Sequence, residues 1–141
     1  MSFRLNHHNK ILTILECLDC EILEKGSTYF GGGTLLALDF QEYRWSNDID
    51  FVSSVNTGGY KYLRTKIFDN GYKILFRDLS KIKIGRSTTD RYGIRMIVSI
   101  DNVPIKTEII AETRFQKEVF KSNMIYLMIC LIHNLFFKAL S

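Results

Sequence analysis

The sequence predicts an α+β fold in which helices pack against a small mixed β-sheet. Three observations support this prediction. Apolar residues recur every three or four positions from Asn9 to Lys25, which is typical of an amphipathic helix. The apolar run at Asp48–Ser53 indicates a short, largely buried strand. Two alternating segments, Arg91–Ile100 and Pro104–Ile110, are separated by a short polar connection and therefore predict a β-hairpin.

The other elements follow from the same patterns. Helical spacing predicts two further helices, at Thr34–Phe40 and Tyr60–Asn70. Short apolar or alternating runs predict three further strands, at Tyr29–Phe30, Tyr72–Phe76 and Leu79–Ile84.

The composition is that of an ordinary soluble globular protein. The chain has 141 residues, of which 46% are hydrophobic and 24% charged, and this length suits one domain with a single core. The net charge of +4 is compatible with contact to nucleotides or RNA but does not establish it, because many basic proteins bind neither. The polar N-terminal segment MSFRLNHHNK does not have the pattern of a signal peptide, so we expect a cytoplasmic protein.

Two aspartates, Asp48 and Asp50, lie within the predicted buried strand. Because strand side chains alternate between faces, both carboxylates share one face, about 7 Å apart along the strand. Such oxygen donors could hold Mg²⁺ while leaving positions for water and substrate phosphates. The alternative is a solvated pair on an edge strand, and for an Asp-x-Asp pattern alone that alternative is favoured.

Three consecutive glycines, Gly31, Gly32 and Gly33, lie between a predicted strand and a predicted helix. Glycines at such a junction let backbone N–H groups approach a phosphate, and a helix N-terminus favours negative charge. The spacing matches neither the dinucleotide-binding fingerprint nor a Walker A loop. A tight turn that needs positive φ is the alternative, and it is the better explanation of the glycines taken alone.

The combination of GGGTLLAL with RWSNDIDF resembles the nucleotidyltransferase superfamily related to DNA polymerase beta. The signature of that superfamily is a Gly-Gly or Gly-Ser turn followed by Asp-x-Asp/Glu. Within it, the Gly-Gly-Thr-x-Leu-x-Leu turn and the Arg-x-Ser-x-Asp-Ile-Asp-Phe run are most similar to the AbiEii/AbiGii toxin family, the toxin half of type IV toxin–antitoxin systems. The resemblance is concentrated in Phe30–Val52 and extends to VPIKTEIIAE around Glu108.

This resemblance implies a nucleotidyltransferase fold and a metal-dependent enzyme. Such an enzyme would move a nucleoside monophosphate from an NTP to a hydroxyl acceptor, with tRNA or another RNA expected, and an antitoxin would be its partner. Catalysis would use Mg²⁺ or Mn²⁺ held by Asp48, Asp50 and Glu108. The superfamily carries its third carboxylate on a strand beside the Asp-x-Asp strand, and the segment IKTEII is similar to that position.

Glu108 is a candidate site residue even when the resemblance is set aside. Alternation places it on one face of its strand together with Lys106 and Ile110. A carboxylate in mid-strand is costly to bury unless it is paired or bound to a metal. The catalytic interpretation is our prediction, and the alternative is an outward glutamate paired with Lys106.

The same resemblance implies a substrate-binding set before and beside the aspartates. The phosphates would be held by Gly32, Gly33 and Thr34. Arg44 could contact the triphosphate or hold the aspartates in place, and a purely structural ion pair is an equal alternative. Ser46 is included in the predicted set, although a turn cap is the simpler explanation for it.

A group of basic residues in the second half of the chain remains open to two interpretations. Such residues usually form a solvated face, and a surface for acceptor RNA is the alternative. The group consists of Lys81, Lys83, Arg86, Arg91 and Arg95.

We expect residues 1–115 to form the nucleotidyltransferase core and residues 116–141 an apolar C-terminal helix. The apolar run Met124–Phe137 is shorter than the roughly 20 residues that a membrane span needs, so no membrane contact is expected. A buried helix or a homo-oligomer contact would explain it.

Proteins of the AbiEii type continue into a helical region with a lysine and a later aspartate that assist catalysis. In this sequence, the run Lys138-Ala139-Leu140 resembles the start of the lysine-bearing helix. A catalytically silent nucleotide-binding or assembly subunit with the same fold is therefore the alternative function.

Overall fold

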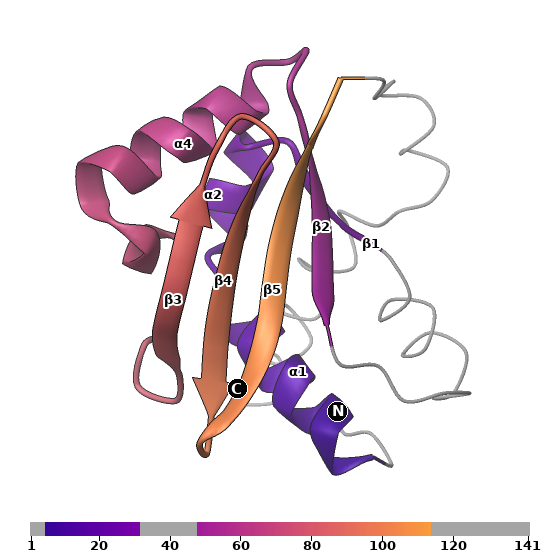
Figure 1. Cartoon of the computed structure of the whole chain (residues 1–141), viewed down its shortest axis with the longest axis vertical. Helices are drawn as coiled ribbons and strands as arrows, with labels where there is room; N and C mark the ends of the chain where they lie inside the picture. Colours follow the sequence, from indigo (N-terminus) through magenta and orange to yellow (C-terminus); the bar gives the residue numbers. More distant parts are fainter. Residues whose placement is uncertain (1–4, 32–47, 114–141) are drawn as a thin grey trace, which may run out of the picture.

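The computed structural model describes residues 5–31 and 48–113, which form a mixed β-sheet with helices on one face (Figure 1). Among the described strands, β2 and β5 are the one parallel pair, and every other neighbouring pair is antiparallel. The chain thus combines a mixed sheet with helices, as predicted. In sheet order, the five strands are β1 (Thr28–Gly31), β2 (Ile49–Ser54), β5 (Val103–Glu112), β4 (Gly93–Ile100) and β3 (Lys83–Thr89).

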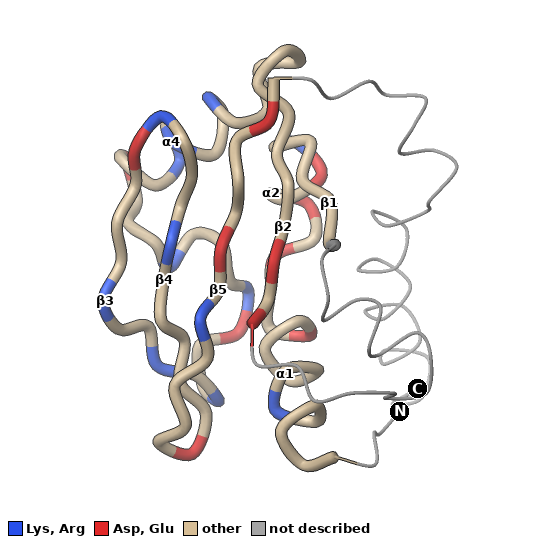
Figure 2. The backbone as a smooth tube through the Cα atoms, turned by 45° about the vertical axis from the view of Figure 1, so that its right-hand side comes forward, with Lys and Arg blue, Asp and Glu red and all other residues tan. Residues whose placement is uncertain are grey.

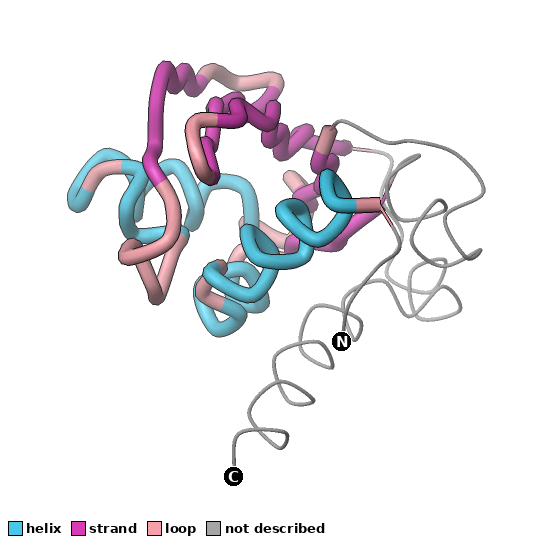
Figure 3. Tube along the Cα trace, turned by 90° about the horizontal axis from the view of Figure 1, so that it is seen from below, coloured by secondary structure: helices cyan, strands magenta, loops and turns pink. Residues whose placement is uncertain are grey.

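The helices cover one face of this sheet, and the core lies between them and the strands (Figure 3). Apolar residues at helical spacing in the helices meet the inward positions of the strands. The rings of Phe30 and Phe51 pack with their centroids 5.4 Å apart at the centre of this core. The helical elements are α1 (Asn6–Cys17), α2 (Cys20–Lys25), α4 (Gly59–Asn70) and the 3₁₀ helix η1 (Tyr72–Leu75).

The prediction of one continuous helix over Asn9–Lys25 is wrong, because the chain leaves the helical conformation at Leu18. Asp19 begins α2 as its N-cap, and its Oδ1 accepts a hydrogen bond from the Ile22 amide at 3.1 Å. Leu18 fits the apolar helical spacing but is buried in an extended conformation, where it bridges to Phe76. The apolar pattern therefore continues through a break in the backbone.

The predicted strand at Tyr72–Phe76 is also wrong. Its first four residues form η1, and only Phe76 makes a bridge, with Leu18. The carbonyl oxygen of Leu75 accepts a hydrogen bond from the Asp19 amide at 2.8 Å. Leu75 and Phe76 are both buried, and two consecutive buried residues suit a compact turn better than an alternating strand.

The strand predicted at Leu79–Ile84 lies later in the chain, at Lys83–Thr89. This strand is at the edge of the described sheet and pairs only with β4. Its side chains are exposed or half-buried. The strand therefore lacks the alternation of buried apolar and exposed polar positions that identifies a central strand in a sequence.

The predicted hairpin and the predicted helix at Tyr60–Asn70 are confirmed. β4 and β5 are joined by Asp101 and Asn102, with φ of 51° and 66°. Two successive positive φ values are the mark of a type I′ turn, in which Asp and Asn are common. α4 begins one residue before the predicted helix and ends at the same residue.

The predicted helices at Thr34–Phe40 and within 116–141 lie outside the described residues. Within 5–31 and 48–113, no helix has the length and apolar character needed to cross a bilayer.

The backbone at the end of α2 lies very close to the backbone at the start of α4. A Cβ atom on Gly59, at the start of α4, would lie 2.4 Å from the carbonyl oxygen of Gly26, which follows α2. Because the obstructing atom belongs to the backbone, rotation of a side chain cannot relieve the overlap. A residue without a side chain is therefore required at position 59.

We expect Gly59→Ala to lower the free energy of unfolding by about 1–3 kcal/mol, the usual cost of overpacking. Urea denaturation followed by circular dichroism measures this change. Gly85→Ala is the matched control, since the nearest atom to its Cβ, the carbonyl oxygen of Ile97, lies at an ordinary 3.4 Å. Equal stability of the two variants would contradict the proposed close contact.

Candidate active site

The face of the sheet opposite the helices carries acidic side chains on its two parallel strands. In β2, Ile49 and Phe51 point into the core, so Asp50 points to the other face. In β5, the buried positions Thr107 and Ile109 flank Glu108 in the same way. The register of the two strands places Asp50 directly opposite Glu108. Acidic positions on β2 and β5 therefore lie side by side (Figure 2).

The charges on this face influence one another. The pKa of Asp50 is raised above its usual value, first by burial and then by the negative charges of Asp48 and Glu108. Lys106 acts in the opposite direction and lowers this pKa. The three carboxylates predicted to act together are thus close enough to interact electrostatically.

Glu108 is held by two cationic side chains. Its Oε1 lies 3.4 Å from Nε of Arg95, and its Oε2 lies 3.3 Å from Nζ of Lys106. The Glu108 side chain is only 15% exposed, whereas the two cations are roughly half exposed, at 42% and 51%. The ion pair with Lys106, anticipated as the alternative to a catalytic role, is therefore present.

Arg95 is a further residue of this site, and the sequence indicates it only as a member of the basic group. It lies directly opposite Glu108 on β4 and also contacts Oδ2 of Asp90 at 3.6 Å. A sequence signal existed, because pairing residues outward from a two-residue turn at Asp101–Asn102 brings Arg95 to Glu108.

The three carboxylates fit a divalent metal chemically. Their oxygens are the donors that Mg²⁺ prefers, and a bound cation would offset the repulsion that raises the pKa of Asp50. In the part of the chain that the structure describes, no three His, Cys, Asp or Glu side chains are already grouped as metal ligands. To join such a site, Glu108 would exchange its contacts with Arg95 and Lys106 for the metal.

Of the predicted phosphate-binding turn, only the first glycine is described. Gly31 ends β1 and pairs with Asp50 on β2, so the chain leaves the sheet beside the candidate carboxylates. The other predicted substrate-binding residues lie outside the described part, and their role stays a prediction. They are Gly32, Gly33, Thr34, Arg44 and Ser46.

We expect Asp50→Asn to stabilise the metal-free protein at neutral pH. Because the pKa of Asp50 is raised on folding, the folded protein binds this proton more tightly than the unfolded chain does. The free energy of unfolding should therefore fall as the pH rises from below the unfolded pKa of Asp50 through its folded pKa. Asparagine removes this loss, because it does not ionise.

The measurement is urea denaturation in EDTA at several pH values between 3 and 7. The stability difference between Asp50→Asn and wild type should grow in favour of the variant as the pH rises. Asp101→Asn in the β-turn serves as a control away from the acidic face. A difference for Asp50→Asn that is independent of pH would show that the carboxylate does not titrate abnormally.

Comparison with known proteins identifies the family. A family model described as nucleotidyl transferase AbiEii toxin, type IV TA system, matches residues 14–125. No curated protein and no solved structure matches the chain. The matched segment contains Asp48, Asp50 of β2, and Glu108, which pairs with Asp50 on β5. The chain therefore belongs to the AbiEii family of nucleotidyl transferase toxins of type IV toxin–antitoxin systems, as its sequence resemblance predicted.

Proposed function

We propose that the protein transfers a nucleoside monophosphate from an NTP to a hydroxyl group of an acceptor RNA, with tRNA as the first candidate. The observation that supports this most directly is the pairing of Asp50 with Glu108 on the face opposite the helices, with Asp48 two residues before. In a nucleotidyl transferase family, such a row of interacting carboxylates is the expected position of the reacting groups.

Asp48, Asp50 and Glu108 would hold Mg²⁺ or Mn²⁺. When bound, the metal supplies charge neutralisation for the triphosphate and for the leaving pyrophosphate. Glu108 would complete the metal site or accept the proton of the acceptor hydroxyl. The hydroxyl oxygen forms a bond to the α-phosphorus, the bond from that phosphorus to the bridging oxygen breaks, and pyrophosphate leaves.

The cations beside Glu108 would then have a second role. If Glu108 turns towards a metal, Lys106 and Arg95 lose a negative partner beside the place where the triphosphate binds. Each could contact phosphate oxygens from there. The predicted phosphate-binding turn would approach from the end of β1, because Gly31 pairs with Asp50.

In its biological setting, we propose a cytoplasmic toxin restrained by an antitoxin protein. The family match supports the toxin part of this proposal. The reaction itself requires NTPs and RNA, which are available in the cytoplasm.

Incubation with each of four α-³²P-labelled NTPs, Mg²⁺ and total RNA tests the proposal. Label from one or more NTPs should appear on an RNA band, and label from the corresponding γ-³²P NTP should not, since pyrophosphate is released. EDTA should abolish the signal. The chain is tested both when purified alone and after separation from a bound antitoxin. If no NTP labels RNA in either sample, the transferase proposal fails.

A catalytically silent subunit is the second candidate function. It is supported by the ion pairs that occupy both carboxylate oxygens of Glu108. Under this alternative, NTP would raise the thermal stability of the protein while no RNA is labelled. The two measurements together therefore separate the candidates.

A further inference from the structure

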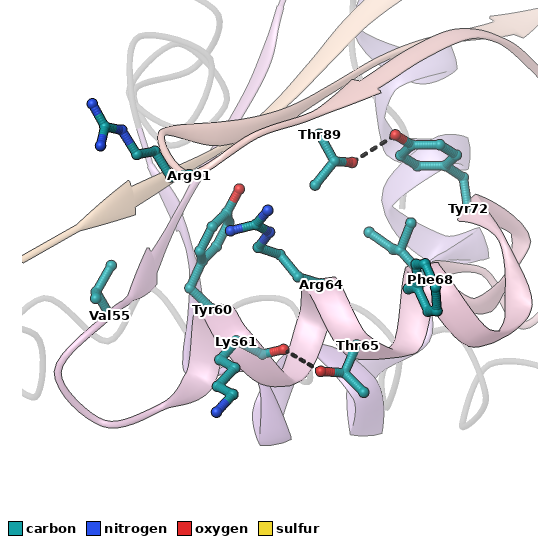
Figure 4. Close-up of a pocket in the computed structure, with 10 residues that line it drawn as sticks. Val55, Tyr60, Lys61, Arg64, Thr65, Phe68, Tyr72, Thr89 and Arg91 are labelled. Carbon is teal, nitrogen blue, oxygen red and sulfur yellow. Dashed lines mark hydrogen bonds between the residues drawn. The ribbon is translucent and has the colours of Figure 1, made fainter.

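A groove lies between α4 and the turn that joins β3 to β4, on the side of the sheet that α4 covers (Figure 4). Its volume is about 790 Å³, and its lining includes α4 residues, Thr89 and Arg91. Cavities of about 300–1,000 Å³ are typical of sites for small organic ligands. The groove can therefore hold a ligand of nucleotide size.

The groove is cationic. Lys61, Arg64 and Arg91 line it, and no Asp or Glu does. Within the described residues, none of these three cations forms an ion pair. Arg91 does contact Tyr92, to whose hydroxyl its Nη2 donates a hydrogen bond and over whose ring its guanidinium lies. A guanidinium group without a carboxylate partner keeps further N–H groups that can bind a phosphate. The expected ligand is therefore anionic.

Aromatic rings accompany the cations. Tyr60, Phe68 and Tyr72 line the groove, and Phe68 is 90% exposed although it is a large apolar residue. The Arg64 guanidinium lies 5.9 Å from the centroid of the Tyr60 ring. Tyr60 is buried and Tyr72 half-buried, so Phe68 is the ring of this groove on which a base could stack. Cations beside an exposed ring are typical of surfaces that bind single-stranded nucleic acid, because phosphates contact the cations and bases stack on the ring.

Contacts join this groove to the candidate active site. The Tyr60 hydroxyl donates a hydrogen bond to the carbonyl oxygen of Asp90, 2.5 Å away, in the turn that carries Arg91. The carboxylate of Asp90 contacts Arg95, which in turn contacts Glu108. A strand of acceptor held in the groove would thus bind to the turn that supports one of the predicted catalytic residues.

We propose that this groove binds a nucleotide unit in a single-stranded segment of RNA. Arg64 would contact a phosphate of this unit and Phe68 would stack on its base, while Arg91, at the other end of the groove from Phe68, would contact a phosphate further along the strand (Figure 4). The inference rests on the proposed function for its identification of RNA as the acceptor. A free NTP has the same chemistry, so the test must separate an RNA strand from a free nucleotide.

The test measures the binding of a fluorescein-labelled 12-nucleotide single-stranded RNA by anisotropy, without metal or NTP. For the double variant Arg64→Gln/Arg91→Gln we expect affinity to fall about tenfold or more. The slope of log K against log salt should decrease by about 0.7 for each cation removed. Phe68→Ala should weaken binding about fivefold or more, because a stacking ring is lost.

The matched control is Lys83→Gln/Arg86→Gln, which removes the same charge from exposed positions of β3 that do not line the groove. It should bind RNA within about twofold of wild type, apart from a small change in salt dependence. A loss equal to that of the groove variant would overturn the proposal in favour of a general basic face. Unchanged binding after Phe68→Ala would also overturn it, because any polyanion would then suffice.

Two further measurements, NTP binding and NMP transfer, show whether the groove binds an RNA strand or a free nucleotide. Fluorescence titration with Mg²⁺ and a fluorescent NTP analogue should give the same affinity for wild type and for the groove variant. If the groove variant loses NTP affinity but keeps RNA affinity, the groove is a free-nucleotide site and the proposal fails.

If wild type transfers NMP to RNA and the groove variant binds RNA normally, this inference fails while the proposed function stands. Groove-dependent RNA binding without any transfer would instead support the groove and contradict the proposed function.

Discussion

Replacing both Asp48 and Asp50 by asparagine is expected to reduce NMP transfer by about a thousandfold or more, while the protein remains folded. Loss of preorganised charge at developing transition-state charges commonly costs this much. The two residues lie on the face opposite the core, and the burial of Asp50 already disfavours its charged form, so the fold does not depend on these charges. The labelled-NTP assay with Mg²⁺ measures the loss.

Thermal denaturation gives an independent measurement of the same change. With wild type, Mg²⁺ and an NTP at about 100 times the dissociation constant should add about 2.7 kcal/mol to the free energy of unfolding. The double variant should show no such gain. Glu24→Gln/Asp69→Asn is the matched control, since both side chains are exposed and lie on helical elements. A gain in the double variant equal to that of wild type would place the metal–nucleotide site elsewhere.

Glu108→Gln is expected to reduce the rate of transfer by about a hundredfold or more while leaving the affinity for Mg²⁺–NTP within about threefold. Two aspartates can still hold the metal and triphosphate, whereas the acceptor oxygen needs the third carboxylate. The predicted result is a fall in kcat with little change in KM for the NTP. Single-turnover kinetics separates the chemical step from binding.

Glu112→Gln is the control for this change, because Glu112 lies on the same strand but at its end, opposite Ser54. It should transfer at nearly the wild-type rate. If Glu108→Gln unfolds more easily than this control, the ion pairs with Arg95 and Lys106 contribute to stability as well. A wild-type rate for Glu108→Gln would assign Glu108 a purely structural role.

Local patterns predicted the elements that make up the centre of the sheet. β2, the β4–β5 hairpin and α4 each follow from residues that are close in sequence, such as the Asp101–Asn102 turn. The parallel pairing of β2 with β5 joins residues more than fifty positions apart and has no local signal. The family resemblance, which expects a third carboxylate beside the Asp-x-Asp strand, was what indicated it.

Two of the wrong predictions, the continuous helix over Asn9–Lys25 and the strand at Tyr72–Phe76, have a common physical cause, which is tertiary contact made by backbone groups. The break at Leu18 and the compact turn at η1 hold each other through hydrogen bonds from the amides of Asp19 and Arg77. Neither segment shows this in its own apolar pattern. Asp19 was the one local signal available, because aspartate is a preferred N-cap.

The alternatives left open at the site depend on side-chain placement, which no spacing rule specifies. The sequence put Glu108 and Lys106 on one face, and the structure shows them in contact. The pairing of Arg95 with Glu108 follows only when the register of the hairpin is counted from its two-residue turn, and the contact of Arg95 with the other carboxylate oxygen depends on the conformations of both side chains.

The order of the strands also has a consequence for how the protein is made. β5 is the last strand of the described sheet to be synthesised, yet it lies between β2 and β4 in the middle of that sheet. The β1–β2 and β3–β4 pairs can form on a ribosome-bound chain, but within the described sheet no strand pairing joins them until β5 emerges. Glu108 arrives with that strand. If Asp50 and Glu108 work together as proposed, the two carboxylates meet only after β5 has been synthesised and has paired with β2.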